Sequence, residues 1–274
     1  MKIAYVAGCT HSGSTLTNRV LGAHPDVVTL GSVKKFDSIM RGRKKCCCGA
    51  PNLFECEFWG KVNEELKQDN LSLDTLRLQT RRNPYFEQHN LAFFSAIGRA
   101  TGAQVIVDSS RRSSRQQRLA KMPELEVVPI HLYKTPLGQA GSWKKKGQNL
   151  LQFVFGYWAR NLRILNAFRK DPKTLMFSYE HFCRHPESEL RRLFAAFGLE
   201  YDPEVLKSWG EKPIHTLGGN HMKHNPSSEI YLDESWRKVL SPHEIRVMNG
   251  TCQILWKVMH RRQFGDAPPS ESAD

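Results

Sequence analysis

Residues 8–15 read GCTHSGST and have the spacing of a phosphate-binding loop. The apolar run at residues 3–7 precedes them and a helical pattern at residues 15–21 follows, which is the order of strand, loop and helix that such a site needs. The glycines let backbone N–H groups converge on an anion at the amino end of the helix. Ser14 stands where nucleoside triphosphatases have a lysine, so the loop suits a phosphate-like group better than a triphosphate with its metal ion. The alternative is a tight turn without a ligand.

A second polar pair follows another expected strand, at residues 130–133. Lys134 comes directly after that strand, Pro136 turns the chain, and Ser142 lies eight residues after the lysine. This spacing lets a cation and a hydroxyl from the next helical turn meet around one phosphate. A solvated lysine and a helix-capping serine are the alternative.

The bulk composition is that of a globular chain. Its 274 residues, 40% hydrophobic and 24% charged, suffice for one large α/β domain or two small ones. Because the chain has no run of about eighteen apolar residues and no signal-peptide pattern at its start, we expect a cytoplasmic protein with no membrane partner. The formal net charge of +13 favours an anionic ligand. Nucleic acid is the rival on charge alone, but the positive residues are spread along the chain without a zinc-finger or RNA-binding signature.

The seven cysteines are an odd number, and without an export signal we expect no disulfide framework. Four of them cluster: Cys46, Cys47, Cys48 and Cys56. Four thiols could hold zinc, but the paired C-x-x-C spacing of structural zinc sites is absent, and the spacing of His215, His221 and His224 fits no common metal site. We therefore expect a reduced, thiol-rich loop over the active site and no metal.

The order of elements predicts the architecture. Strands are expected at residues 3–7, 27–30, 104–107 and 130–133, with helices between them, the clearest at residues 85–101. This alternation predicts an α/β fold with one parallel sheet flanked by helices on both faces and ligands beyond the carboxyl ends of the strands.

The order of these elements also predicts the domain organisation. One domain is expected over residues 1–264, with an irregular, basic lid or insertion loop at residues 33–57 and a disordered tail at residues 265–274. A core-facing helical stripe is expected at these positions: Val154, Trp158, Leu162 and Leu165.

Taken together, these motifs resemble the sulfotransferase family that uses 3′-phosphoadenylyl sulfate (PAPS), over nearly the whole chain. Residues 8–16 look like that family's loop for the 5′-phosphosulfate, and residues 132–136 with Ser142 resemble its element for the 3′-phosphate. Weaker resemblances follow in the right order: residues 105–111 to a V-D-S-S-K turn, residues 178–186 to a Y-E-D motif, residues 218–223 to a late G-N-x-M-R element and residues 233–236 to D-x-x-W.

The resemblance implies a P-loop-like sulfotransferase fold in a single domain. It implies transfer of a sulfuryl group from PAPS to a hydroxyl or amine of a small-molecule acceptor, which leaves adenosine 3′,5′-bisphosphate and needs no metal. The cofactor-binding residues that it implies are Cys9, Thr10, His11, Ser12, Gly13, Ser14, Thr15, Leu16, Lys134, Ser142, Tyr179 and Lys223. The catalytic residues that it implies are His11, Asp108, Arg111 and His89.

Each implied catalytic residue has a role and an alternative. His11 would neutralise charge on the bridging oxygen, and Arg111 would stabilise the transferred group unless it is only a solvated charge. Asp108 is the first candidate for the base that removes the acceptor's proton. The alternative is that Asp108 only caps the helix that follows it. His89 is the second candidate and otherwise an ordinary surface or core histidine.

The chain departs from that family at three points. His11 stands where the family commonly has Arg or Lys, and an imidazole donates to the leaving oxygen only if it is protonated or in the right tautomer. Lys134 replaces the usual arginine with a point charge. Gly31 and Ser32 stand where related bacterial sequences often have Gly-Glu, so a glutamate base is not available there.

Two other functions compete with this interpretation. A P-loop nucleotide or metabolite kinase would need the missing loop lysine and magnesium. A basic nucleic-acid-binding protein would bind with an affinity that falls steeply with salt. The identity of the acceptor, and whether its reacting atom is oxygen or nitrogen, cannot be read from the sequence.

Overall fold

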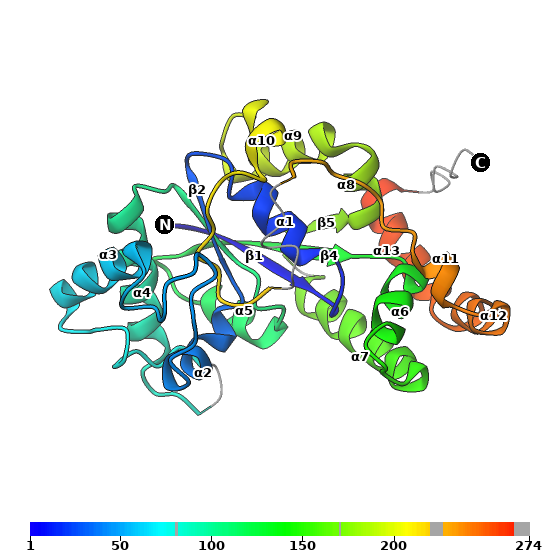
Figure 1. Ribbon diagram of the computed structural model, residues 1–274, viewed down its shortest axis with the longest axis horizontal. Coiled ribbons are helices and arrows are strands. Elements are labelled where there is room, and N and C mark those ends of the chain that lie inside the picture. Colours follow the sequence, from blue (N-terminus) through cyan, green and yellow to red (C-terminus); the bar gives the residue numbers. More distant parts are fainter. Residues whose placement is uncertain (80–81, 170, 220–226, 266–274) are drawn as a thin grey trace.

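Five parallel strands form one sheet in the spatial order β2-β3-β1-β4-β5 (Figure 1). The computed structural model describes residues 1–79, 82–169, 171–219 and 227–265. The strands are β1 Lys2–Gly8, β2 Val27–Gly31, β3 Val105–Asp108, β4 Glu126–Tyr133 and β5 Leu175–Ser178. At the end of β1, Gly8 pairs with Leu132 of β4, so the loops that follow these two strands begin at nearly the same level.

Helices fill the connections between the strands and follow the last of them. The first group is α1 Ser14–Leu21, the 3₁₀ turn η1 Val33–Lys35, α2 Phe36–Arg41, α3 Glu57–Leu66, the 3₁₀ turn η2 Lys67–Asp69, α4 Phe86–Thr101 and α5 Ser113–Leu119. The second group is α6 Pro136–Lys144, α7 Leu150–Phe168, α8 Tyr179–Arg184, α9 Pro186–Phe197, α10 Glu204–Ser208, α11 Trp236–Val239, α12 Pro242–Thr251 and α13 Gln253–Phe264. In Figure 1, α3 and α4 lie at the β2 side of the sheet, while α12 and α13 lie at the β5 side.

Both faces of the sheet are buried because successive side chains of a strand point to opposite faces. Ile3 and Tyr5 enter the core formed with α3, α4, α5 and the carboxyl half of α7. Ala4 and Val6 enter the core formed with α1, α8 and α9. A third core joins α6, the amino half of α7, α12 and α13 beside β4 and β5. The predicted α/β fold with helices on both faces is therefore confirmed.

The predicted strands at residues 3–7, 27–30, 104–107 and 130–133 all exist, and β4 begins four residues earlier than expected. Pro129 lies inside β4 and pairs with Tyr5 of β1. β5 was not predicted, because Leu175, Met176 and Phe177 lack the β-branched side chains that mark β3, a strand of the same length. Among the described residues, none of the helices combines the length and apolarity that a bilayer crossing requires.

Two local predictions are wrong. Residues 33–57 are not irregular throughout, because η1 and α2 occupy residues 33–41 and side chains such as Phe36 and Leu53 are buried in the core. The stripe expected on α7 is wrong at Leu162, which is 47% exposed, whereas Leu165 is buried and Val154 and Trp158 pack against the third core beside the buried Phe153 and Tyr157. Two aromatic side chains one position earlier fill the space against α6 and β4, and this sets the rotation of the helix.

Candidate functional site

The phosphate loop connects β1 to α1 with a sharply curled backbone. His11 and Gly13 have positive φ angles of 65° and 96°, and Gly13 is the residue that precedes the helix. The Thr17 N–H donates to the Gly13 carbonyl at 3.1 Å and closes the first turn of α1. The Ser12 hydroxyl is buried and has no hydrogen-bond partner among the described residues. The first N–H groups of α1 therefore face the same space as the loop, as an anion site requires.

Tyr179 connects this loop to the end of β5. A Cβ atom on Gly13 would lie 2.8 Å from Cε2 of the Tyr179 ring, so the ring packs directly on the glycine. The ammonium of Lys134 lies 4.0 Å from the centroid of the same ring. The structure thus brings together three predicted cofactor-binding residues, which follow β1, β4 and β5.

Lys134 and Ser142 both adjoin the first turn of α6. The Lys134 side chain passes Gly138, where an added Cβ would lie 2.6 Å from the lysine Cε. The Ser142 hydroxyl donates to the Gly138 carbonyl at 3.0 Å. Burial lowers the pKa of Lys134, whereas the charge of Glu180 acts in the opposite direction. The Lys134 side chain and the Ser142 hydroxyl therefore both approach Gly138 of α6, with a buried carboxylate close to the lysine.

A group of crowded cations surrounds the loop on its other side. We call Lys34, Arg111 and Arg160 the cation cluster. Burial lowers the pKa of Lys34 to about 8, and the charges of Arg111 and Arg160 contribute. Burial and Arg160 also lower the pKa of Arg111. None of these three residues belongs to an ion pair within the described part of the chain. Lys34 and Arg111 follow β2 and β3, and uncompensated cations at strand ends favour an anionic ligand there.

His11 lies between the cation cluster and Lys134. Burial, and then the charges of Lys146, Arg111 and Lys134, lower its pKa to about 4. The imidazole is therefore neutral at pH 7 and carries one N–H donor.

The structure gives Asp108 fixed partners within the core. Its carboxylate is fully buried, pairs with Arg115 Nε at 2.8 Å and accepts hydrogen bonds from the backbone and hydroxyl of Ser110. Arg115 also donates to the Asn90 side chain at 2.6 Å. These contacts hold the turn after β3, in which Arg111 has a positive φ of 61°. The geometry fits a positioning role for Asp108 better than that of an accessible base.

His89 has only local contacts. It lies on α4, accepts a hydrogen bond from the Arg77 N–H at 2.9 Å and stacks on Tyr85 with ring centroids 5.2 Å apart. Burial lowers its pKa. Lys223, predicted to bind the cofactor, lies outside the described residues, as do residues 266–274 of the predicted tail.

Sequence reasoning missed two members of the cation cluster. Lys34 follows β2 by three residues, and its place after a strand was the only local signal. Arg160 lies in the middle of α7 and comes close to Arg111 only in the folded chain.

Four potential metal ligands also come together away from the phosphate loop. The ligand atoms of Cys46, Cys48, Cys56 and His215 all lie within 4.8 Å of one another. The sequence predicted no metal here, because the paired C-x-x-C spacing is absent and because the spacing of His215 with His221 and His224, which lie outside the described residues, fits no common metal site.

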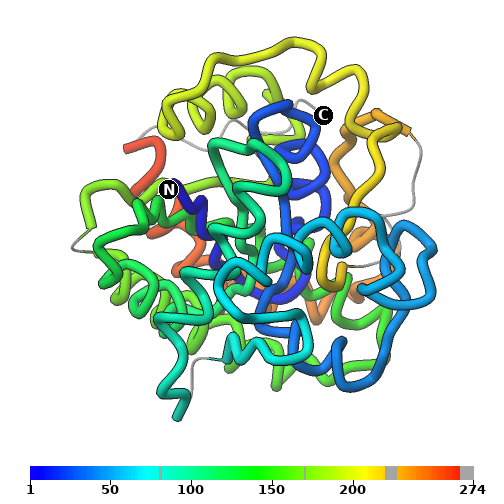
Figure 2. The backbone as a smooth tube through the Cα atoms, turned by 90° about the vertical axis from the view of Figure 1, so that its left-hand side faces the viewer, coloured from blue at the N-terminus to red at the C-terminus, as the bar shows by residue number. Residues whose placement is uncertain are grey.

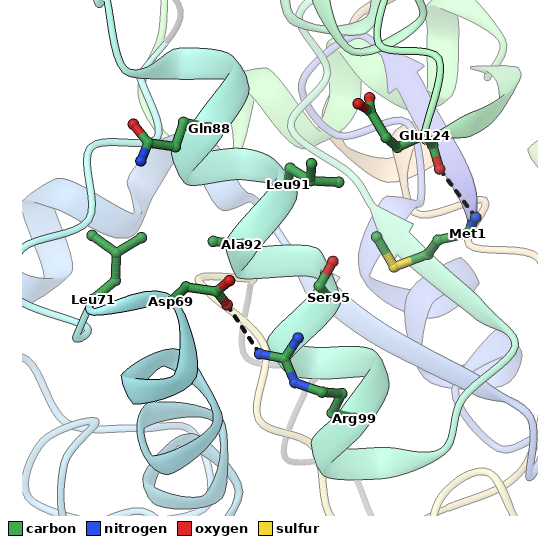
Figure 3. Close-up of a pocket in the computed structure, with 9 residues that line it drawn as sticks. All are labelled: Met1, Asp69, Leu71, Gln88, Leu91, Ala92, Ser95, Arg99 and Glu124. Carbon is green, nitrogen blue, oxygen red and sulfur yellow. Dashed lines mark hydrogen bonds and ion pairs between the residues drawn. The ribbon is translucent and has the colours of Figure 1, made fainter.

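A hollow of about 460 Å³ lies at the opposite edge of the sheet, next to the amino end of β1 (Figure 3). In this hollow Arg99 pairs with both Asp69 and Glu65, and the Met1 amino group donates to the Glu124 carbonyl. In parallel α/β sheets ligands bind beyond the carboxyl ends of the strands, so this hollow is not the candidate site.

No protein-family model matches the chain, and no curated protein is similar to it in sequence. Solved structures with a similar fold include two sulfotransferase domains. The sulfotransferase domain of the olefin synthase from Synechococcus PCC 7002 is 17% identical with a TM-score of 0.62, over 94% of each chain. The sulfotransferase domain from the curacin biosynthetic pathway is 17% identical with a TM-score of 0.56, over 92% of this chain and 96% of the other. The likeness confirms the sulfotransferase fold that the motifs predicted.

Proposed function

From the sulfotransferase fold and the geometry of the phosphate loop, we propose that this protein transfers a sulfuryl group from PAPS to a hydroxyl or amine of a small-molecule acceptor. One observation carries the proposal. A phosphate loop without the triphosphatase lysine follows β1, and a buried cation follows the adjacent strand β4, with Tyr179 between them. Two anion-binding segments side by side suit a nucleotide with phosphate groups at two positions.

In this proposal the two segments hold opposite ends of the donor. The loop N–H groups and the hydroxyls of Ser14 and Thr15 bind the 5′-phosphosulfate. Lys134 and Ser142 bind the 3′-phosphate. Tyr179 keeps the Lys134 ammonium over the loop and contacts the adenine. The loop positions Cys9, Thr10 and Leu16, and Lys223 beyond the described residues, complete the set that the resemblance implies.

Sulfuryl transfer makes the same physical demands as phosphoryl transfer, namely alignment and charge stabilisation. The acceptor atom forms a bond to sulfur while the bond from sulfur to the bridging oxygen breaks, and that oxygen stays on the 5′-phosphate of the leaving nucleotide. His11 donates its N–H to the bridging oxygen, and Arg111 with Arg160 stabilises the sulfuryl oxygens.

We assign the base to Lys34 in place of Asp108, whose carboxylate is enclosed by Arg115 and Ser110. Lys34 lies after β2, is half-buried in the cation cluster, and has a pKa lowered by burial and by Arg111 to about 8. A lysine with such a pKa can accept the proton of the acceptor near neutral pH. Lys34→Arg keeps the charge and cannot act as a base. We therefore expect it to lose turnover and the rise of rate with pH while nucleotide binding is retained, and a variant with wild-type turnover would remove Lys34 from the mechanism.

The test of the function is a comparison of ligands by thermal unfolding. Adenosine 3′,5′-bisphosphate at about 100 times its dissociation constant adds about 2.7 kcal/mol of stability, which corresponds to a rise in Tm of about 5 °C or more. ATP with magnesium should give little change. A larger shift with ATP and magnesium would favour a kinase, and salt-sensitive binding of nucleic acid without any nucleotide shift would favour the other alternative.

A further inference from the structure

We infer that Cys46, Cys48, Cys56 and His215 form a structural zinc site. Cys48 Sγ lies 3.6 Å from Cys56 Sγ, and Cys56 Sγ lies 3.1 Å from His215 Nδ1. Four ligands around a tetrahedral zinc, with Zn–S near 2.3 Å and Zn–N near 2.0 Å, are separated by about 3.5–3.8 Å along the edges of the tetrahedron. The four ligand atoms, all within 4.8 Å of one another, therefore surround a space of the size that one zinc ion needs.

The local chain builds the first half of this site as a tight turn. The Cys46 N–H donates to the Ala50 carbonyl at 2.9 Å, and the Gly49 N–H donates to the Cys46 carbonyl at 3.1 Å. Gly49 has a φ of 102°, a conformation that favours glycine and lets the chain reverse directly after the thiols. The neighbouring Cys47 is not a ligand, because its thiol donates to the Ile214 carbonyl at 2.8 Å.

Helix α3 orients the other half. Cys56 is the residue that precedes α3, and its carbonyl accepts from the Gly60 N–H at 2.7 Å. Trp59 Nε1 donates to the His215 carbonyl at 3.0 Å, and the Phe58 ring stacks on the His215 ring with centroids 5.0 Å apart and planes 11° from parallel. Two neighbouring aromatic residues thus hold the imidazole in place, as the surroundings of metal ligands usually do.

The ligand chemistry favours zinc over other metals. Thiolates and an imidazole suit zinc in a four-coordinate site, whereas carboxylates, carbonyls or water would suit magnesium or calcium. An iron–sulfur cluster takes four cysteines in its ordinary form. Because the protein fills all four positions, the site is of the closed, structural type. Cys48 is exposed, which gives the ion a path of entry, while Cys46 and Cys56 are buried.

The site would fasten two distant segments to the β2 edge of the sheet. Figure 2 shows the yellow segment before residue 219 passing beside the blue and cyan segments around residues 46–56. Two residues after His215, Leu217 exchanges backbone hydrogen bonds with Leu30 and Ser32 at the end of β2, at 2.7 and 2.9 Å. The ion would therefore hold the strand end that carries Lys34. This inference does not depend on the proposed transferase activity.

The experiment measures zinc in the full chain, purified without chelators, by mass spectrometry of the metal. We expect about one zinc per chain in the wild type and in Cys47→Ser, and about tenfold less in Cys48→Ser and His215→Ala. The matched control is strong because Cys47 lies between two of the ligands and differs from them only in where its thiol points. His215→Cys, which replaces one zinc ligand by another, should restore the metal.

A second measurement avoids variants that fail to fold. Replacement of the metal by cobalt(II) in the wild-type protein should give the visible absorption of a tetrahedral, thiolate-bound ion, and removal of the metal by a chelator should lower Tm. The inference is overturned if the wild type binds neither metal, if Cys47→Ser loses as much zinc as Cys48→Ser, or if the freshly purified chain contains a Cys48–Cys56 disulfide.

Discussion

Gly13→Ala is the substitution that most directly tests how the phosphate loop meets the end of β5. Gly13 has a φ of 96°, and a Cβ there would lie 2.8 Å from Cε2 of Tyr179 and closer still to Cδ2. Tyr179 is 4% exposed, and the Lys134 ammonium lies on its ring face, so the ring has little room to withdraw. Either the loop or the ring must move, and both belong to the proposed nucleotide site.

The loss of stability expected for Gly13→Ala has two separate causes. Alanine in a left-handed conformation costs roughly 1–2 kcal/mol relative to glycine. Overpacking against a buried ring costs about 1–3 kcal/mol, while the lower entropy of the unfolded alanine chain returns about 0.4–1 kcal/mol. The net loss should be about 2–4 kcal/mol, a fall in Tm of roughly 5–10 °C for a chain of this size.

Urea unfolding of four proteins measures these costs: the wild type, Gly13→Ala, Tyr179→Ala and the double variant. With the ring removed, only the backbone cost remains, so the coupling between the two substitutions should be about 1–3 kcal/mol. Gly250→Ala is the matched control, since it lies within α12 and its Cβ would meet no atom within 4 Å. A Gly13→Ala protein as stable as this control, or a coupling near zero, would refute the contact between loop and ring.

Three other residues and one buried pair give further predictions. Lys134→Ala should weaken binding of adenosine 3′,5′-bisphosphate at least about tenfold in calorimetry while leaving acceptor affinity nearly unchanged, since a charge-assisted contact is worth about 1.5–3 kcal/mol; equal losses would count against the assignment. His11→Ala should lower turnover without lowering Tm, and unchanged turnover would exclude His11 from the mechanism. Burial lowers the pKa of His131 to about 4. As the pH falls from 6.5 to 4, the unfolded chain therefore binds a proton at this histidine while the folded chain does not. This difference should lower the free energy of unfolding by about 3 kcal/mol. In His131→Gln, the free energy of unfolding measured with urea should no longer show this fall with pH. A variant whose free energy of unfolding falls with pH as in the wild type would contradict the prediction. Asp108→Asn should destabilise the chain by about 3–5 kcal/mol because it leaves Arg115 buried and unpaired, and a variant as stable as the wild type would show that the pair is dispensable.

The parts of the fold that the sequence predicted are those with a local physical cause. Four of the strands are apolar runs bounded by polar or glycine residues, and the phosphate loop is a contiguous motif. β5 lacks the β-branched residues that mark β3, and the rotation of α7 depends on how Phe153 and Tyr157 fill the space beside α6. Both are decided by packing partners elsewhere in the chain, which periodicity within one segment does not reveal.

The candidate site also contains some residues that local sequence could predict and others that depend on distant partners. Lys134 and Ser142 could be paired from their spacing because the start of α6 brings both side chains to Gly138. The enclosure of Asp108 could not be predicted, since it depends on Arg115, which follows a loop, and on Asn90 from another helix. His215 could not be linked to the cysteines from the sequence for a related reason: it follows Cys56 by 159 residues, so no spacing rule connects them.

The order of the strands explains why the two segments proposed to bind the donor meet at all. The chain leaves β1 toward β2 on one side of the sheet and leaves β4 toward β5 on the other, while β1 and β4 are neighbours. At such a point the two connections separate and leave a crevice beyond the strand ends, which is where ligands bind in doubly wound sheets. The phosphate loop and Lys134 are the first residues of those two connections, so each needs only a short turn to face the crevice. The cation cluster approaches the same crevice from β2, β3 and α7, and a ligand that carries negative charge at both ends and at its transferable group would compensate all three regions at once.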